Sequence, residues 1–372
     1  MRDWPNEVPR EDQSVHPTVS TAAVRRWPVI VLAFTLAAAG IAGGFIRRNT
    51  PDAPAALAEV AGEQETPAVD EPPATGDSPV PVASPDLGSL VRIDATTGEI
   101  VARVPIPRPT LVASDGDSVW VLSEGIFGGG ALVHVEAATD AITGVSAVEF
   151  PTTTELAVAG GSAWLGSDRG TAYRFAPGAI TGEPARFDVA SSEFLWPVAA
   201  AGSLWISCCR LPPTLLRVDP ATGRVLARID RVERVVASGT GFLWALDWEE
   251  GRASRLVRID TETHATVPIG ALGFRWFDLT VADGAVWASS PKDGSIVRLD
   301  PLTGEANQRI PVGGEPGALA AGAGAVWAAI GKDATVTRYV IAADRIEAID
   351  VGGTPIDLVF ARDSVWVMVS PP

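Results

Sequence analysis

Few residues in this chain are of the types that usually perform chemistry. The 372 residues include three histidines and two cysteines, against twelve tryptophans and eleven phenylalanines. The two cysteines, Cys208 and Cys209, are adjacent, and with so few histidines they cannot build an ordinary zinc site. We therefore expect no metal site, no cofactor and no catalytic residues, and look for binding chemistry instead.

The two cysteines open a loop that also contains Arg210. Outside the cytoplasm, such a neighbouring pair can form a disulfide that stiffens the loop. Two reduced thiols without a special role are equally compatible with the sequence. Both alternatives stay open at this stage.

Aromatic side chains that depart from the regular pattern of the chain are the best candidates for a binding site. They lie with a few charged residues in loops that we expect on one face of the molecule, and this mixture is typical of binding sites. The alternative is that they cap the ends of structural repeats and partly bury one another. The candidate residues are Phe194, Trp196, Cys208, Cys209, Arg210, Trp248, Phe274, Arg275 and Trp276.

A repeat of about 40 residues organises the part of the chain that must position these side chains. A small residue followed by an apolar residue and Trp recurs at intervals of 39 to 44 residues, at Trp120, Trp164, Trp205, Trp244, Trp287, Trp327 and Trp366. A second phrase, Val91-Arg92-Ile93-Asp94, recurs in step with it. Two phrases with one period indicate a repeat architecture.

Each repeat is typical of four β-strands. In residues 279–311, short apolar runs are separated by the Asp283-Gly284 pair, a polar loop and the turn Pro301-Leu302-Thr303-Gly304. Seven inner and seven outer hairpins predict an all-β fold, a seven-bladed β-propeller. We expect the N-terminal hairpin 89–106 to complete the blade that begins at 358–369, which closes the ring.

The repeats resemble those of YVTN-type and streptogramin-lyase-like seven-bladed propellers, through the Gly-apolar-Trp strand and the Arg-Ile-Asp-Pro-x-Thr-Gly hairpin. For the lyase of that group, the resemblance implies that activity depends on a set of two histidines and one glutamate. In this chain only two histidines, His134 and His264, lie in the repeats. A weaker resemblance links the hairpin to quinoprotein (PQQ-like) repeats. Their docking Trp is replaced by Ala102, Ala227 and Gln308.

The N-terminal part differs from the repeats in composition and charge. Residues 27–46 are uncharged and bracketed by arginine pairs, and a helix of that length spans a bilayer. We expect a short tail at 1–26, a single transmembrane helix at 27–46 and an acidic, Pro/Ala-rich linker at 47–88, followed by the propeller at 89–372. A cleaved signal peptide and a buried core helix are the alternatives.

The net charge of −16 argues against a nucleic-acid partner. We expect a cell-membrane protein whose propeller stands outside the cytoplasm and acts as a non-catalytic ligand- or protein-binding or sensing module. The competing class is an extracytoplasmic enzyme, either a lyase or a quinone-dependent oxidoreductase, with its site on the same aromatic loop face.

Overall fold

The computed structural model describes residues 88–371, with gaps at 125–129, 149–152, 190–193, 209–212, 240, 248–254 and 271–277. These residues belong to one compact unit, residues 74–372. The predicted tail, membrane span at 27–46 and linker lie outside the described residues. Within the described part, no helix has the length and apolar character to cross a membrane.

Seven antiparallel sheets of four strands, here called blades 1 to 7, make up the fold. Blade 1 contains β3 (Pro109–Ser114), β4 (Ser118–Glu124), β5 (Gly130–Glu136) and β6 (Ile142–Val148). Blade 2 contains β7 (Thr153–Ala159), β8 (Ser162–Ser167), β9 (Thr171–Phe175), the 3-10 helix η1 (Pro177–Ala179) and β10 (Ala185–Asp188). Blade 3 contains β11 (Trp196–Ala200), β12 (Ser203–Cys208), β13 (Thr214–Val218) and β14 (Val225–Asp230).

The next three blades follow the same order along the chain. Blade 4 contains β15 (Val232–Gly239), β16 (Phe242–Asp247), β17 (Arg255–Asp260) and β18 (Thr266–Gly270). Blade 5 contains β19 (Leu279–Ala282), β20 (Ala285–Ser290), η2 (Pro291–Asp293), β21 (Ser295–Leu299) and β22 (Ala306–Pro311). Blade 6 contains β23 (Pro316–Gly322), β24 (Ala325–Ile330), η3 (Gly331–Asp333), β25 (Thr335–Val340), η4 (Ile341–Ala343) and β26 (Arg345–Asp350).

Blade 7 joins the two ends of the folded chain. Its strand order is β2-β1-β28-β27, formed by β1 (Ser89–Asp94), β2 (Ile100–Pro105), β27 (Thr354–Ala361) and β28 (Ser364–Ser370). Strand β1 pairs with β28 from Ser89 opposite Val369 to Asp94 opposite Ser364. The predicted seven-bladed ring and its mode of closure are confirmed.

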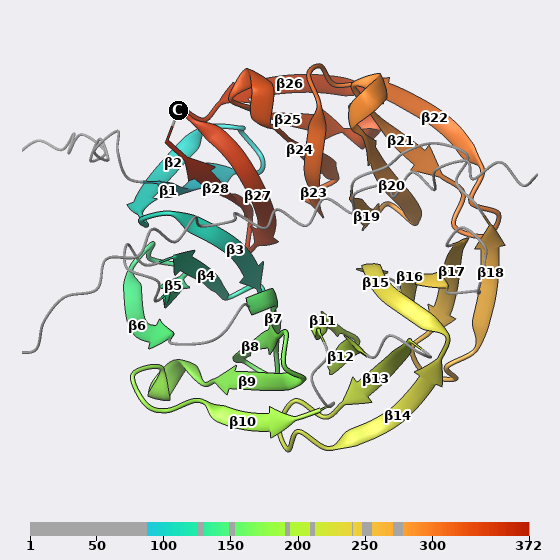
Figure 1. Ribbon diagram of the computed structural model, residues 1–372. Helices are drawn as coiled ribbons and strands as arrows, with labels where there is room; N and C mark the ends of the chain where they lie inside the picture. Colours follow the sequence, from blue (N-terminus) through green and yellow to red (C-terminus); the bar gives the residue numbers. More distant parts are fainter. Residues whose placement is uncertain are drawn as a thin grey trace, which may run out of the picture. The chain divides into compact units, whose positions relative to one another are not determined.

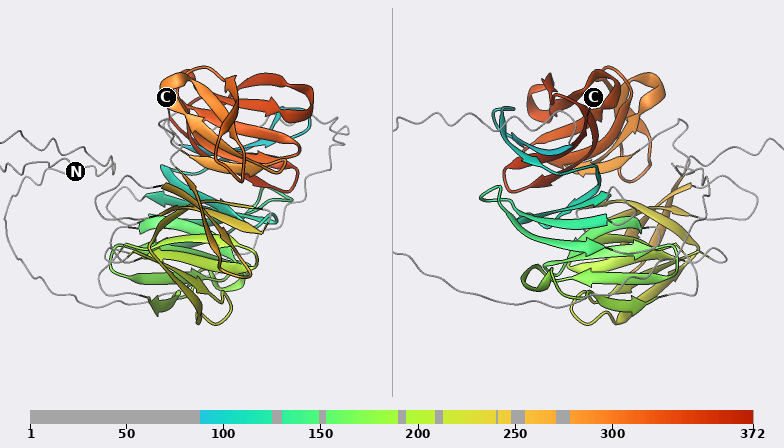
Figure 2. Two further views of the ribbon diagram at one scale, coloured as in Figure 1. Left: turned by 90° about the vertical axis from the view of Figure 1, so that its right-hand side faces the viewer. Right: turned by 60° about the vertical axis from the view of Figure 1, so that its left-hand side comes forward.

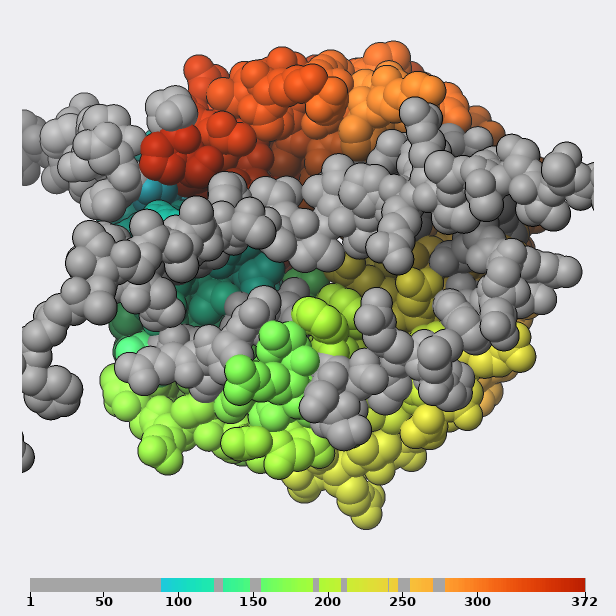
Figure 3. Space-filling view, viewed as in Figure 1, coloured from blue at the N-terminus to red at the C-terminus, as the bar shows by residue number. Residues whose placement is uncertain are grey.

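The blades surround an axis in chain order. Strands β3, β7, β11, β15, β19, β23 and β27 lie innermost (Figure 1). Turned views show the orange and red blades at one edge of the ring and the green and yellow blades at the other (Figure 2). In the space-filling view the coloured blades succeed one another round the rim (Figure 3). The first strands of all seven blades therefore surround the axis of the ring.

The seven periodic tryptophans fill the seams between neighbouring blades. All are at most 1% exposed, and each belongs to a hydrophobic cluster. Trp164 of blade 2, for example, packs in one cluster with Leu204 and Ile206 of blade 3. Their role as packing residues, expected from the large apolar surface of the indole, is confirmed.

In five of the seven blades, an arginine of the third strand makes a hydrogen bond to the next blade. The guanidinium of Arg217 lies 5.5 Å from the ring centre of Trp205, and its Nη1 donates to the Thr261 carbonyl of blade 4 at 3.1 Å. Arg338 repeats this between blades 6 and 7, over Trp327 and onto the Thr96 carbonyl. The arginines are thus bracing groups, which stabilise the blade contacts by cation–π attraction and charged hydrogen bonds.

The turn residues act as their types predict. Asp300 Oδ1 accepts hydrogen bonds from the amides of Leu302 and Thr303 at 2.8 and 2.9 Å, the Asx turn expected at the head of the hairpin. At the inner hairpin of blade 5, Asp283 and Gly284 both have positive φ, 48° and 67°, as a tight two-residue turn requires.

Candidate binding site on the inner strands

Phe194 and Trp196, two of the predicted site residues, form a stacked pair at the start of blade 3. Their ring centres are 6.0 Å apart and their planes differ by 17°. Leu195 between them is fully buried, and its amide donates to the Ser167 carbonyl of blade 2 at 3.0 Å. Because successive side chains of an extended segment point to opposite sides, this anchor turns both rings the other way. Phe194 remains 44% exposed.

Cys208 ends β12 with only 2% of its surface exposed, within the hydrophobic cluster between blades 2 and 3. A side chain in that position contributes to packing and does not present itself to a ligand. Cys209, the next residue in the sequence, lies outside the described residues, so the disulfide and the two reduced thiols both stay as alternatives. The site roles of Arg210, Trp248, Phe274, Arg275 and Trp276 stay predictions for the same reason.

The strand register reveals one equivalent position in all seven blades. In blade 7, Leu358 pairs with Val367, the residue after the periodic Trp366, and Asp357 immediately precedes Leu358. The same rule selects one residue per blade, here called the inner-strand position. From blade 1 to blade 7 these are Leu111, Glu155, Trp196, Arg234, Asp278, Ala318 and Asp357.

The charged members of this set converge near the axis of the ring. Arg234 Nη2 lies 3.3 Å from Glu155 Oε2, although blades 2 and 4 are separated by blade 3. Asp278 of blade 5 and Asp357 of blade 7 also interact electrostatically with each other and with Glu155. We call Glu155, Trp196, Arg234, Asp278 and Asp357 the axial cluster.

Burial raises the pKa of all three carboxyl groups in the axial cluster. The pKa of Asp357 rises to about 8, first because it is withdrawn from water and then because Asp278 and Glu155 add negative charge. The pKa of Asp278 rises to about 6 from the same loss of water. Glu155 shifts in the same direction through burial, opposed mainly by Arg234, and keeps 29% of its side chain exposed.

Asp278 also connects two blades. Its Oδ2 accepts from the amide of Leu319 on β23, and its Oδ1 from its neighbour Leu279, both at 2.8 Å. Ser289 donates its amide to the Asp278 carbonyl, which fixes the backbone of this residue in register with β20. These backbone donors favour the charged carboxylate and hold the pKa of Asp278 below the level that burial alone would produce.

Sequence reasoning found Trp196 but missed its four charged neighbours in the cluster. The inner-strand position can be located in the sequence, because it lies immediately before the apolar run that begins each inner hairpin. That signal is weak because the residue type changes from blade to blade. Irregular pairing near Glu155, Arg234 and Asp357 further hides their equivalence.

Chemically, the cluster offers three carboxylates and one guanidinium beside a stacked aromatic pair. Such a surface can accept hydrogen bonds from a ligand and pack against its apolar part. Among the residues that the structure describes, no three His, Cys, Asp or Glu side chains are placed to hold a metal ion.

The two histidines of the propeller serve the outer hairpins. The ring of His134 lies 4.4 Å from that of Trp120, and its Nδ1 is 2.6 Å from Thr143 Oγ1. His264 Nε2 lies 3.3 Å from Arg217 Nη1 in another blade contact. The two are in blades 1 and 4 and take part in packing.

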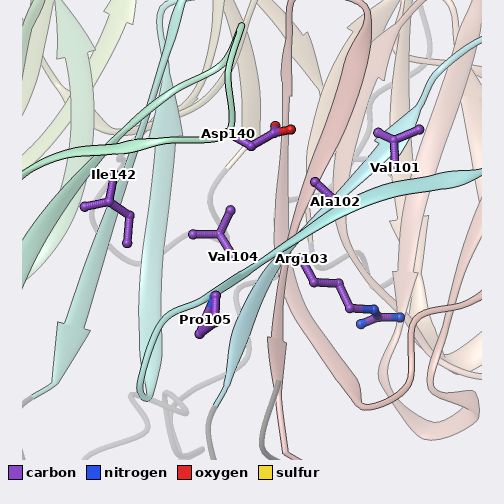
Figure 4. Close-up of a pocket in the computed structure, with 7 residues that line it drawn as sticks. All are labelled: Val101, Ala102, Arg103, Val104, Pro105, Asp140 and Ile142. Carbon is purple, nitrogen blue, oxygen red and sulfur yellow. The ribbon is translucent and has the colours of Figure 1, made fainter. Parts of the chain in front are cut away.

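Two open grooves lie away from the axial cluster. One, of about 440 Å³, separates β2 from β6 at the outer rim and is lined by Val104, Ile142 and Asp140 among others (Figure 4). Arg103 points to the other side of β2, where it donates to the Val351 carbonyl. The other, of about 320 Å³, lies between blades 2 and 3. Neither is lined by a predicted site residue.

Comparisons with known proteins agree on the fold. No family model matches the chain, and no curated protein matches its sequence. Among solved structures, the chain is similar to hydrazine synthase of Kuenenia stuttgartiensis, with a TM-score of 0.54 and 14% identity over 72% of this chain and 97% of that one. It is also similar to apo AztD of Citrobacter koseri, with a TM-score of 0.51 and 12% identity over 76% and 100% of the two chains. At these identities the likeness concerns the propeller alone.

Proposed function

We propose that this protein is a non-catalytic binding module that takes a ligand or protein partner at the axial cluster and the adjoining Phe194 ring. The observation that carries the proposal is a contrast within the repeats. The buried seam position is Trp in all seven blades, whereas the inner-strand position holds six different residue types. A position that serves only packing has no reason to vary in this way, and variation on one face of a repeat array is typical of a binding surface.

The exposed aromatic ring supports the same conclusion. Phe194 keeps 44% of its surface in water, although its neighbour Leu195 is fully buried in the same segment. Aromatic rings beside hydrogen-bonding groups are enriched at recognition sites, because they supply large apolar contact at low entropic cost.

Membrane anchoring and an extracytoplasmic position are part of this proposal. They rest on the uncharged 27–46 stretch between arginine pairs and on the acidic linker that follows it. Membership of the YVTN and streptogramin-lyase-like group rests on the hairpin and Trp phrases. Protease added to intact cells is expected to degrade the propeller, and full protection would contradict the outside placement.

A photo-crosslinking amino acid in place of Phe194 tests the binding function in intact cells. The matched control carries the same amino acid in place of Leu302, which is 63% exposed in a turn of an outer hairpin. We expect covalent adducts at position 194 that are absent at position 302 and disappear when Trp196 is replaced by Ala. The same adducts at both positions, or none at 194, would contradict a site at this face.

Catalysis at the same face is the second candidate function, and one observation favours it. Two carboxyl groups with raised and different pKa values are typical of sites that catalyse by general acid and general base. A lyase of this kind would lose turnover with Asp357→Asn while its folding is retained. For the oxidoreductase alternative, a quinone absorption band in the purified protein would overturn our preference for a binding module.

A further inference from the structure

The charges of the axial cluster are unbalanced. At the seven inner-strand positions, three carboxylates face one guanidinium, which leaves two net negative charges when all are ionised. Arg234 is paired with Glu155 at 3.3 Å. Asp278 and Asp357 therefore lack an ion-pair partner of their own at these positions.

The surroundings of Asp357 make its negative charge unfavourable. Strands β3, β23 and β28, which pack against β27, carry no titratable side chain. The helix η3 brings Lys332 and Asp333, but Lys332 is bonded to Glu315 at 2.6 Å. Arg338 of β25 is engaged with Glu347 and a backbone carbonyl.

The contacts that Asp357 does make are few. Within the described residues, its carboxylate accepts a single hydrogen bond, from the amide of Leu358 to Oδ1 at 2.8 Å. Among the described residues, the charges that raise its pKa are those of Asp278 and Glu155, both negative. A proton on its Oδ2 removes this repulsion and leaves the Leu358 hydrogen bond in place.

The carboxylate of Asp278 accepts more hydrogen bonds than that of Asp357, but it lies near the same negative charges. Strand β15 beside it contributes Arg234 and the exposed Glu233, while β20 carries no titratable side chain. Two backbone amides hold its carboxylate oxygens, one of them across the seam to blade 6. Its proton uptake is thus expected at lower pH than that of Asp357, as their pKa values of about 6 and about 8 indicate.

We propose that the axial cluster is a proton-operated charge switch in which Asp357, followed by Asp278, takes up a proton from solvent as the medium passes from mildly alkaline to mildly acidic. Uptake by Asp357 leaves one net negative charge in the cluster, and uptake by Asp278 leaves none. The switch requires no movement of the blades, because the groups are fixed on the innermost strands.

This inference rests on the proposed function where it concerns ligands. A cationic group would be held more strongly in alkaline than in mildly acidic medium, whereas an anionic group would show the reverse order. The titration itself involves no ligand, so it can succeed or fail independently of the binding proposal.

The test is a carbon NMR titration of the protein labelled with ¹³C at the aspartate carboxyl carbon. We expect one resonance with a midpoint near pH 8 that disappears in Asp357→Asn. The matched control, Asp283→Asn, removes a carboxylate from an exposed turn at the far end of β19 and should keep that resonance. In Arg234→Gln, the midpoint of Asp278 should move to higher pH, because its nearby positive charge is lost.

Proton uptake gives a second readout. Between pH 6 and pH 9, Asp357→Asn should take up about one proton fewer than the wild type. If Asp357→Asn does not fold, the NMR titration of the wild-type protein alone tests the proposal. The absence of any aspartate midpoint above pH 6, or an unchanged titration in a folded Asp357→Asn, would overturn the proposal.

Discussion

At the scale of single residues, the propeller contains aspartates with opposite pKa shifts. Asp94, Asp260 and Asp300 open the outer hairpins, and backbone amides hold the pKa of each below its usual value. Asp357 and Asp278 lie near the axis, where burial raises their pKa values. The two groups therefore affect stability in different pH ranges and with opposite sign.

The raised pKa of Asp357 predicts that stability is lost as pH rises from about 4 to about 8. The folded protein keeps the proton up to about pH 8, whereas the unfolded chain releases it near its ordinary value of 3.8. Between these values the folded state binds more protons, so the free energy of unfolding falls as pH rises. We expect Asp357→Asn to flatten this fall and to be more stable than the wild type at pH 9, as measured by urea denaturation.

The hairpin aspartates act in the opposite sense at low pH. Their folded pKa values are lowered, so their contribution is present above pH 4 and is lost as pH falls through those values. Asp300→Asn should weaken the dependence of the free energy of unfolding on pH below about pH 4 without changing its slope between about pH 5 and about pH 8. An altered slope between about pH 5 and about pH 8 in this variant would contradict the assignment of that slope to Asp357.

At the scale of elements, the contact between consecutive blades combines a buried Trp with an arginine from the third strand. Arg338 is 5% exposed, stacks over Trp327 and reaches the Thr96 carbonyl in the first hairpin of the chain. This contact ties blade 6 to the part of blade 7 that comes from the N-terminal side. Its strength bears directly on the closure of the ring.

Replacing Arg338 by Ala is expected to lower the free energy of unfolding by about 1–3 kcal/mol, because the Thr96 carbonyl and the Glu347 carboxylate, in part-buried hydrogen bonds, lose a charged donor. The control is Arg345→Ala in the same blade, where the side chain is 62% exposed and should change stability by less than about 0.5 kcal/mol. Equal effects of the two variants in denaturant titrations would show that the stacked arginine does not brace the seam.

The same elements show how far the sequence could predict this protein. The Trp period, the Asp283-Gly284 turn and the hairpin aspartates are local signals, and each forms the structure expected of it. Trp196 and Asp357 occupy equivalent positions because Trp196 pairs with Ser207 and Asp357 pairs with Met368. No local sequence pattern contains this information about pairing. The convergence of Glu155 and Arg234 across blade 3 needs the closed ring as well.

At the scale of the whole molecule, closure depends on two strands that come from the start of the folded chain. Deleting residues 89–106 would leave β28 with an unpaired edge in an incomplete blade. Because open edges template association, we expect this variant to aggregate or to unfold well below the wild-type temperature, by size-exclusion chromatography and circular dichroism. Adding the peptide 88–107 should restore part of the loss, and a stable monomer without it would contradict the role of closure.

The position of β1 within blade 7 has a mechanical consequence. It lies between β2 and β28 and is hydrogen-bonded on both sides. A pulling force applied at residue 88 therefore acts along an interior strand, and the bonds on its two flanks must slide and break together. A load directed along the axis of β1, with the other blades held, is therefore met in shear by the hydrogen bonds on both flanks of this strand.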